Sequence, residues 1–187
     1  RRTGGEHGKG AGDQGQRLGL GAGQADDGGG GGVGVKAKAE AAEMVVIGKL
    51  EDYLAIEDIL EIQQPDNPFA EVRIDQVEDD DALDRKALQV REKWQLGIDP
   101  IPSMTALLED KGLKVTETDL PERINGMACH VERADLPPTE VIVVARQTNV
   151  ERKRFNLAHE LAHRIIAGTE NPSIRLEPAM NRFARAF

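Results

Sequence analysis

The stretch from residue 154 to 166 reads Arg-Phe-Asn-Leu-Ala-His-Glu-Leu-Ala-His-Arg-Ile-Ile and places two histidines four residues apart. In an α-helix such residues lie one above the other, with Cβ atoms about 5–6 Å apart. His159 and His163 can therefore direct their imidazoles at one metal ion, and Glu160 can reach a water beside it. Two neutral histidines, an open position and a carboxylate base are typical of zinc hydrolases. The stretch predicts a helix that holds Zn²⁺.

The residues around this motif favour a buried helix. Thr148 or Asn149 can cap its start, Glu151 suits the first turn, and Gly168 suits its end. An apolar stripe recurs at helical spacing through Phe155, Ala158, Ala162 and Ile165. The alternative is a surface pair of histidines beside a salt-bridging glutamate. The half-apolar setting favours the zinc site over that alternative.

A catalytic zinc needs a third protein ligand. In a metzincin, glycine and histidine would follow at positions that here hold Ile166 and Thr169, so that class is excluded. A carboxylate is the remaining option, and Glu170 and Glu177 are the near candidates. Glu177 is favoured, because it opens a second apolar-periodic stretch in which Pro178 suits a first helical turn.

Two segments together resemble the ImmA/IrrE family of metallo-endopeptidases. Residues 151–163 read Glu-Arg-Lys-Arg-Phe-Asn-Leu-Ala-His-Glu-Leu-Ala-His, and residues 177–184 read Glu-Pro-Ala-Met-Asn-Arg-Phe-Ala. The family has a His-Glu-x-x-His helix preceded by Arg-Phe-x-x-Ala, then a second helix with Glu-x-x-x-Asn-x-Phe-Ala. The resemblance runs from about residue 77 to 187. It implies that His159, His163 and Glu177 are the zinc ligands and that Glu160 is the catalytic base.

The same resemblance implies a function. Family members cleave DNA-binding repressors of the helix-turn-helix type, with effects on stress response, mobile elements or toxin-antitoxin regulation. The alternatives are a non-catalytic module that binds such a repressor and an inactive fragment. The presence of Glu160 favours catalysis, because a module that only binds has little reason to keep a base. Family members usually continue beyond the position of Phe187, so the chain is expected to be C-terminally incomplete.

Composition excludes several other classes. The formal net charge of −9 argues against direct nucleic-acid binding by this chain. No apolar run is long enough for a membrane span, and residues 1–20 lack the apolar core of a secretory signal. The single cysteine, Cys129, cannot form an internal disulfide and is expected in the core. A reducing, cytoplasmic location is therefore expected.

The chain is expected to have three parts and an α+β fold. Residues 1–43 are expected to form a disordered, glycine-rich tail, residues 44–76 a helical connector, and residues 77–187 the zinc metallopeptidase domain. A helix is predicted at about 79–96, with a buried stripe of Leu83, Ala87, Val90 and Trp94. A short helix should end near Lys111, before Gly112.

Three stretches predict β-strands, at residues 113–118, 125–131 and 140–145. Pro137 and Pro138 are expected in the connection between the last two strands, and His130 is expected to be an ordinary strand histidine. These elements predict a zincin-like architecture, in which helices pack on a small mixed sheet of about three strands and the active helix lies across it. An edge strand of such a sheet could hold an extended peptide.

Overall fold

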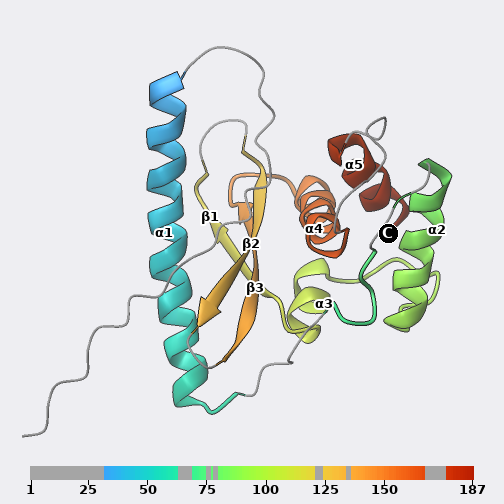
Figure 1. Ribbon diagram of the computed structural model, residues 1–187, viewed down its shortest axis with the longest axis horizontal. Coiled ribbons are helices and arrows are strands. Elements are labelled where there is room, and N and C mark those ends of the chain that lie inside the picture. The colour runs from blue at the N-terminus through green and yellow to red at the C-terminus, as the bar shows by residue number, and fades with distance from the viewer. Residues whose placement is uncertain are drawn as a thin grey trace, which may run out of the picture.

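The computed structural model describes residues 32–62, 69–74, 77, 80–120, 124–133, 136–166 and 176–187. Within these ranges lie five helices and three strands. Figure 1 shows the strands as one sheet with helices on both of its faces. Most of the predicted tail, Gly168 and Glu170 lie outside the described residues.

The sheet has a mixed topology. Its strands are β1 (Lys114–Thr118), β2 (Gly126–Arg133) and β3 (Leu136–Ala145), in the order β1-β3-β2. β3 is central, parallel to β1 and antiparallel to β2. The run Val141–Val144 is fully buried on both faces of the sheet, as expected where helices cover both sides of a strand. The prediction of an α+β fold with three strands is confirmed.

The prediction for Pro137 and Pro138 was wrong, because both residues lie inside β3 rather than in a connection. β1 pairs with β3 only from Val141 onward, so this first part of β3 has no strand partner on that side among the described residues. On the other side, the register with β2 shifts between Val131 and Arg133, opposite the prolines. Proline lacks an N–H group, and edges and bulges are where a sheet tolerates it.

The two faces of the sheet are covered by different helices (Figure 1). The long helix α1 (Gly32–Ile59) covers one face. Its buried residues pack with outward-facing residues of β2 and β3 in one cluster, made of Val46, Leu50, Leu54, Cys129, Val131, Val141 and Val143. The helix α4 (Val150–Ile165) covers the other face, where Ile142 and Val144 join the main core.

The start of α1 corrects the predicted boundary of the tail. The helix begins at Gly32, inside the stretch that was expected to be disordered up to residue 43. Residues 36–43 read Lys-Ala-Lys-Ala-Glu-Ala-Ala-Glu and consist only of strong helix formers. The helix propensity of these residues is sufficient to offset the destabilising effect of the glycines just before them. The division of the remaining chain into connector and peptidase domain stays a prediction.

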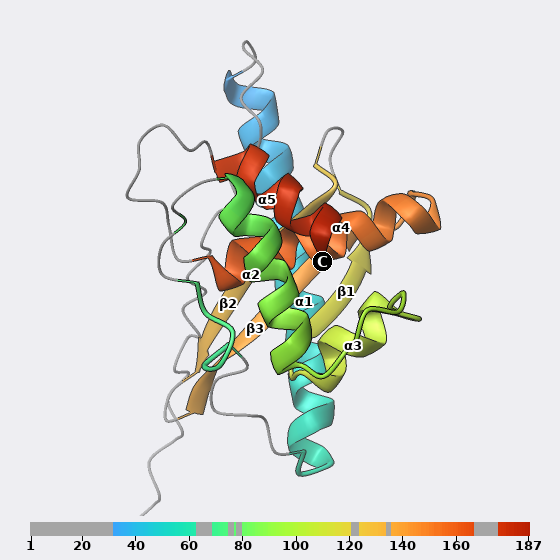
Figure 2. The ribbon, with the colours of Figure 1, turned by 90° about the vertical axis from the view of Figure 1, so that its right-hand side faces the viewer.

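Three further helices complete the layer around α4. They are α2 (Asp80–Lys93), α3 (Met104–Asp110) and α5 (Leu176–Ala186). Figure 2 shows α2 and α5 lying over α4, with the sheet and α1 behind them. The predicted stripe of α2 is buried. Ser103 caps the start of α3, because its side chain accepts a hydrogen bond from the Ala106 N–H. No helix in the described part of the chain is long and apolar enough to cross a membrane.

Candidate metal centre

The helix α4 begins where the sequence predicted it. Asn149 caps it by accepting a hydrogen bond from the Arg152 N–H at 2.8 Å, and Glu151 lies in the first turn. One side of the helix is buried in the core through Leu157, Leu161 and Ile165. The side chains of His159 and His163 retain 14% and 17% exposure. They are thus supported by the core and accessible to a small ligand.

Glu177 reaches these histidines from α5. Its Oε2 lies 3.3 Å from His159 Nε2, and its Oε1 lies 3.4 Å from His163 Nε2. The two Nε2 atoms are 3.1 Å apart. In the described part of the chain this is the only cluster of histidine, cysteine and acidic side chains with metal-ligand geometry. The structure therefore brings together the three residues that the sequence predicted as ligands.

The spacing of these groups is compatible with one bound zinc ion. Zinc bonds of about 2.0–2.1 Å leave neighbouring ligand atoms about 3.3–3.4 Å apart. Each histidine Nε2 lies at about this distance from one oxygen of the Glu177 carboxylate, His159 from Oε2 and His163 from Oε1, and the two Nε2 atoms are slightly closer to each other. The donor set of two imidazoles and one carboxylate is one that zinc accepts. His159, His163 and Glu177 thus fit the ion that the sequence predicted.

The electrostatics keep both histidines in the form that binds metals. Burial, with the neighbouring His159 and Arg164 acting in the same direction, lowers the pKa of His163 to about 4. Burial also lowers the pKa of His159, although Glu177 and a hydrogen bond with Asn181 oppose the change. Both imidazoles are therefore neutral near pH 7, which leaves a lone pair for a metal ion.

Glu160 lies beside this cluster in a buried position. Only 6% of the residue is exposed, and burial, aided by the charge of Glu177, raises the pKa of Glu160 to about 8. Its carboxylate contacts the first residue of β2, where a Cβ added to Gly126 would lie 2.8 Å from Glu160 Oε1 and 3.1 Å from the Val143 carbonyl oxygen. A glycine at position 126 therefore leaves room for the carboxylate.

Sequence reasoning assigned no role to Gly126 or to Asn156. Asn156, one turn before Glu160, is buried, and its Nδ2 donates to the Asn125 carbonyl at 3.4 Å. This contact holds the segment that leads into β2 against α4. A glycine at the start of a predicted strand signals a close approach of backbone, but only the fold shows that the approaching group is Glu160.

The surroundings of His159 fix its ring through packing. The centroids of the Phe155 and His159 rings lie 6.2 Å apart, and the two ring planes are inclined by 34°. The Nδ1 atom of His159 is buried and has no hydrogen-bond partner among the described residues. The ring is therefore oriented by Phe155 and by contacts with Glu177 and Asn181, without the outer hydrogen bond that metal-binding histidines commonly make.

The last turn of α4 is anchored to the sheet. Arg164 donates to both carboxylate oxygens of Glu140 on β3, at 2.6 and 3.0 Å. Its Nη2 also lies 3.4 Å from His130 Nδ1 on β2. His130 lies on β2 and is not among the residues of the ligand cluster. The ion pair ties the end of the helix to the sheet directly after His163.

Comparison with known proteins supports the resemblance seen in the sequence. The family model Peptidase M78, described as the IrrE N-terminal-like domain, matches residues 108–187. No curated protein and no solved structure matches the chain. The matched part begins within α3 and includes the three strands, α4 and α5, but neither α1 nor α2. From residue 108 onward, the chain is thus similar to a family of metallopeptidases.

Proposed function

We propose that this protein is a zinc-dependent endopeptidase. His159, His163 and Glu177 are the metal ligands in this proposal, and Glu160 is the base. The observation that carries it is the convergence of two imidazole nitrogens and one carboxylate within 3.1–3.4 Å, with a second, buried carboxylate next in sequence to the first ligand. The match to a peptidase family over the same helices supports it.

The zinc ion and Glu160 have different roles in the proposed reaction. Zinc, when bound, would lower the pKa of a water to around 7, polarise the scissile carbonyl and favour the ionised form of a nearby carboxylate. Glu160 then accepts a proton from the attacking water and delivers it to the nitrogen of the leaving amine. Such a role contributes typically about 10²–10⁴-fold to the rate. The burial of Glu160 keeps bulk water away from this proton.

The sheet offers a place for an extended substrate. Among the strands that the structure describes, β2 lies at an edge of the sheet, because β3 separates it from β1. Its first residue, Gly126, lies against Glu160. An extended peptide that pairs with the outer edge of β2 would run past this carboxylate. We assign β2 as the strand that positions the scissile bond.

The proposed substrate is a helix-turn-helix repressor, cleaved in the cytoplasm. The family resemblance supports this assignment, and the side chains of the site do not by themselves select it. The net charge of −9 fits a chain that acts on a DNA-binding protein without binding DNA itself.

Glu160→Gln tests the proposal directly. The substitution keeps the shape of the side chain but removes the proton acceptor. The variant should retain about one zinc per chain and still bind the repressor encoded beside its gene. Cleavage, followed as intact repressor by mass spectrometry, should fall by about 10²-fold or more. Glu151→Gln, an exposed change in the first turn of the same helix, is the matched control and should cleave normally.

Three outcomes would contradict the proposal. Equal cleavage by wild type and Glu160→Gln would remove Glu160 from the mechanism. Binding of the repressor by both proteins with cleavage by neither would favour a non-catalytic binding module. His163→Ala should lose the ion, because two protein ligands rarely hold zinc tightly. Retention of zinc by that variant would refute the assignment of the ligands.

A further inference from the structure

The start of β2 lies against the side of α4 that carries Glu160. Asn156 and Glu160 are four residues apart, so their side chains leave the helix on the same face. The buried Asn156 donates from Nδ2 to the Asn125 carbonyl at 3.4 Å. A Cβ added to Gly126 would lie against Glu160. Two successive residues at the start of the strand thus meet two successive turns of the helix.

A side chain at position 126 would point at α4. Side chains alternate between the two faces of a strand. Ala128 belongs to the core on the α4 side, whereas Cys129 and Val131 belong to the cluster under α1, so position 126 shares the face of Ala128. A Cβ there would lie 2.8 Å from Oε1 and 3.0 Å from Cγ of Glu160. Favourable contacts between carbon atoms need about 3.5–4.0 Å, so the carboxylate occupies space that only a glycine leaves open.

The main chain of Gly126 faces away from the centre of the sheet. In an antiparallel pair, residues that bond across the pair alternate with residues whose N–H and C=O groups point outward. The Ala145 N–H donates to the Asn125 carbonyl at 3.0 Å, so these two residues bond across the pair. Gly126 is the next residue and pairs with Val144. Its N–H and C=O groups therefore point away from β3, where a peptide added to this edge would bind them.

We propose that Gly126 is a positioning residue for cleavage, an inference that rests on the proposed function. Its main chain pairs with the peptide, and its lack of a side chain lets the Glu160 carboxylate reach the same level of the strand. The base and the peptide are thus brought together at one residue. The carboxylate is the flexible end of a side chain. A methyl group at position 126 should therefore displace it while the strand pairing and the three metal ligands remain.

The expected signature of Gly126→Ala is a lower kcat with an unchanged KM. For the full chain loaded with zinc, acting on the repressor encoded beside its gene, kcat should fall about tenfold or more, because the base is displaced. KM should change by less than about twofold, because the main chain at this position still pairs, and zinc should stay at about one per chain. Gly48→Ala is the matched control. A Cβ at position 48 meets no atom within 4 Å, so kcat should not change.

Shortening the base tests whether the effect acts through Glu160. Glu160→Asp withdraws the carboxylate from position 126 by one methylene group, so in that background Gly126→Ala should change kcat by less than about twofold. The same substitutions form a double-mutant cycle in urea unfolding of the metal-free protein. Gly126→Ala should lower the folding equilibrium constant at least about fivefold less when Glu160 is shortened. This second measurement does not depend on cleavage.

The two measurements separate this proposal from the proposed function. Coupling in unfolding without cleavage by the wild-type protein would refute the peptidase and support the contact between Gly126 and Glu160. An unchanged kcat in folded Gly126→Ala, or an equal fall in kcat in both backgrounds, would overturn the proposal. If Gly126→Ala does not fold, the double variant should fold, because the carboxylate has withdrawn. Failure of both would place the conflict at the Val143 carbonyl, 3.1 Å from the added Cβ, and would also overturn the proposal.

Discussion

At the scale of single residues, burial shifts the pKa values of the ionisable side chains that form the site. Glu160 is buried against Gly126, and its pKa is raised to about 8. His163 is half-buried, and its pKa is lowered to about 4. Burial disfavours the charged form of each group, so the two shifts have opposite directions. The site without metal thus holds a protonated carboxyl group beside neutral imidazoles near pH 7.

These shifts predict a pH dependence of stability for the protein freed of metal by a chelator. A raised carboxyl pKa contributes stability that is complete below the unfolded value of 4.5 and is lost as the pH rises through about 8. The lowered pKa of His163 has the opposite effect. Its contribution to stability increases with pH and is nearly complete above pH 6.5. Between pH 6.5 and 8, the free energy of unfolding should therefore fall by about 1–2 kcal/mol in wild type. Urea unfolding of Glu160→Gln should show no such fall, and an equal fall in both proteins would assign it to other groups.

The residues of the site differ in how far the sequence predicted them. His159, Glu160 and His163 lie within one helical turn, so their spacing alone implied that they could act together. Glu177 required the expectation of a second helix, and the structure places it 3.3 Å from His159. Gly126 lies on a strand that is distant in sequence. Its role depends on how β2 meets α4, and no local pattern encodes that contact.

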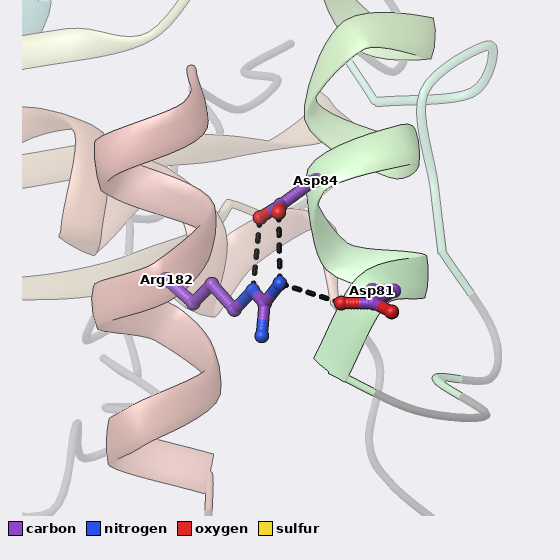
Figure 3. A network of polar contacts seen from close by, with 3 residues as sticks. All are labelled: Asp81, Asp84 and Arg182. Atoms are coloured by element: carbon purple, nitrogen blue, oxygen red, sulfur yellow. Dashed lines mark hydrogen bonds and ion pairs between the residues drawn. The ribbon is translucent and has the colours of Figure 1, made fainter.

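At the scale of elements, the position of α5 decides whether Glu177 can reach the histidines. Arg182 on α5 donates to both oxygens of Asp84 on α2, at 3.0 and 2.9 Å, and to Asp81 at 2.8 Å (Figure 3). The Arg182 hydrogen bond lowers the pKa of Asp84. Phe183, which is fully buried in the core, and this network together fix the position of α5 relative to α2.

We expect Arg182→Gln to loosen α5 selectively. In protein without metal, amides of α5 should exchange with solvent several times faster than in wild type, whereas those of α4 should be unchanged. The zinc dissociation constant should rise, because Glu177 is then held less firmly. The difference in exchange should shrink in 1 M salt, which screens exposed ion pairs. Arg185→Gln is the control, since that arginine is exposed on the same helix; equal effects of the two variants would remove the network from this role.

The elements themselves were predictable to different degrees. Caps and apolar stripes located α2, α3 and α4 closely, because these signals are local. The position of the two prolines in β3 was not predicted. Whether a strand tolerates proline depends on which neighbouring strands pair with that part of it, and this is not visible in the local sequence. The start of α1 was not predicted, because the strong helix propensity of residues 36–43 is sufficient to extend the helix back into the glycine-rich sequence.

At the scale of the whole molecule, α1 and the metal centre lie on opposite sides of the sheet (Figure 1). A buried ion pair between Glu57 of α1 and Lys114 of β1 joins the helix to the sheet. Lys49 also donates to the Glu117 carbonyl at 2.8 Å. These contacts make α1 part of the fold, so its removal would expose the apolar face of β2 and β3.

Leu54→Ala tests whether the packing of α1 on the sheet stabilises the fold. Leu54 is 4% exposed and belongs to the cluster between α1 and the sheet. Its truncation should lower the free energy of unfolding by about 2–4 kcal/mol in urea titrations. Zinc content should not change, because His159, His163 and Glu177 lie beyond the sheet. Ile59→Ala, a change at an 80% exposed position of the same helix, should stay within about 0.5 kcal/mol of wild type. If Leu54→Ala cost no more than Ile59→Ala, α1 would be a connector that rests on the sheet without stabilising it.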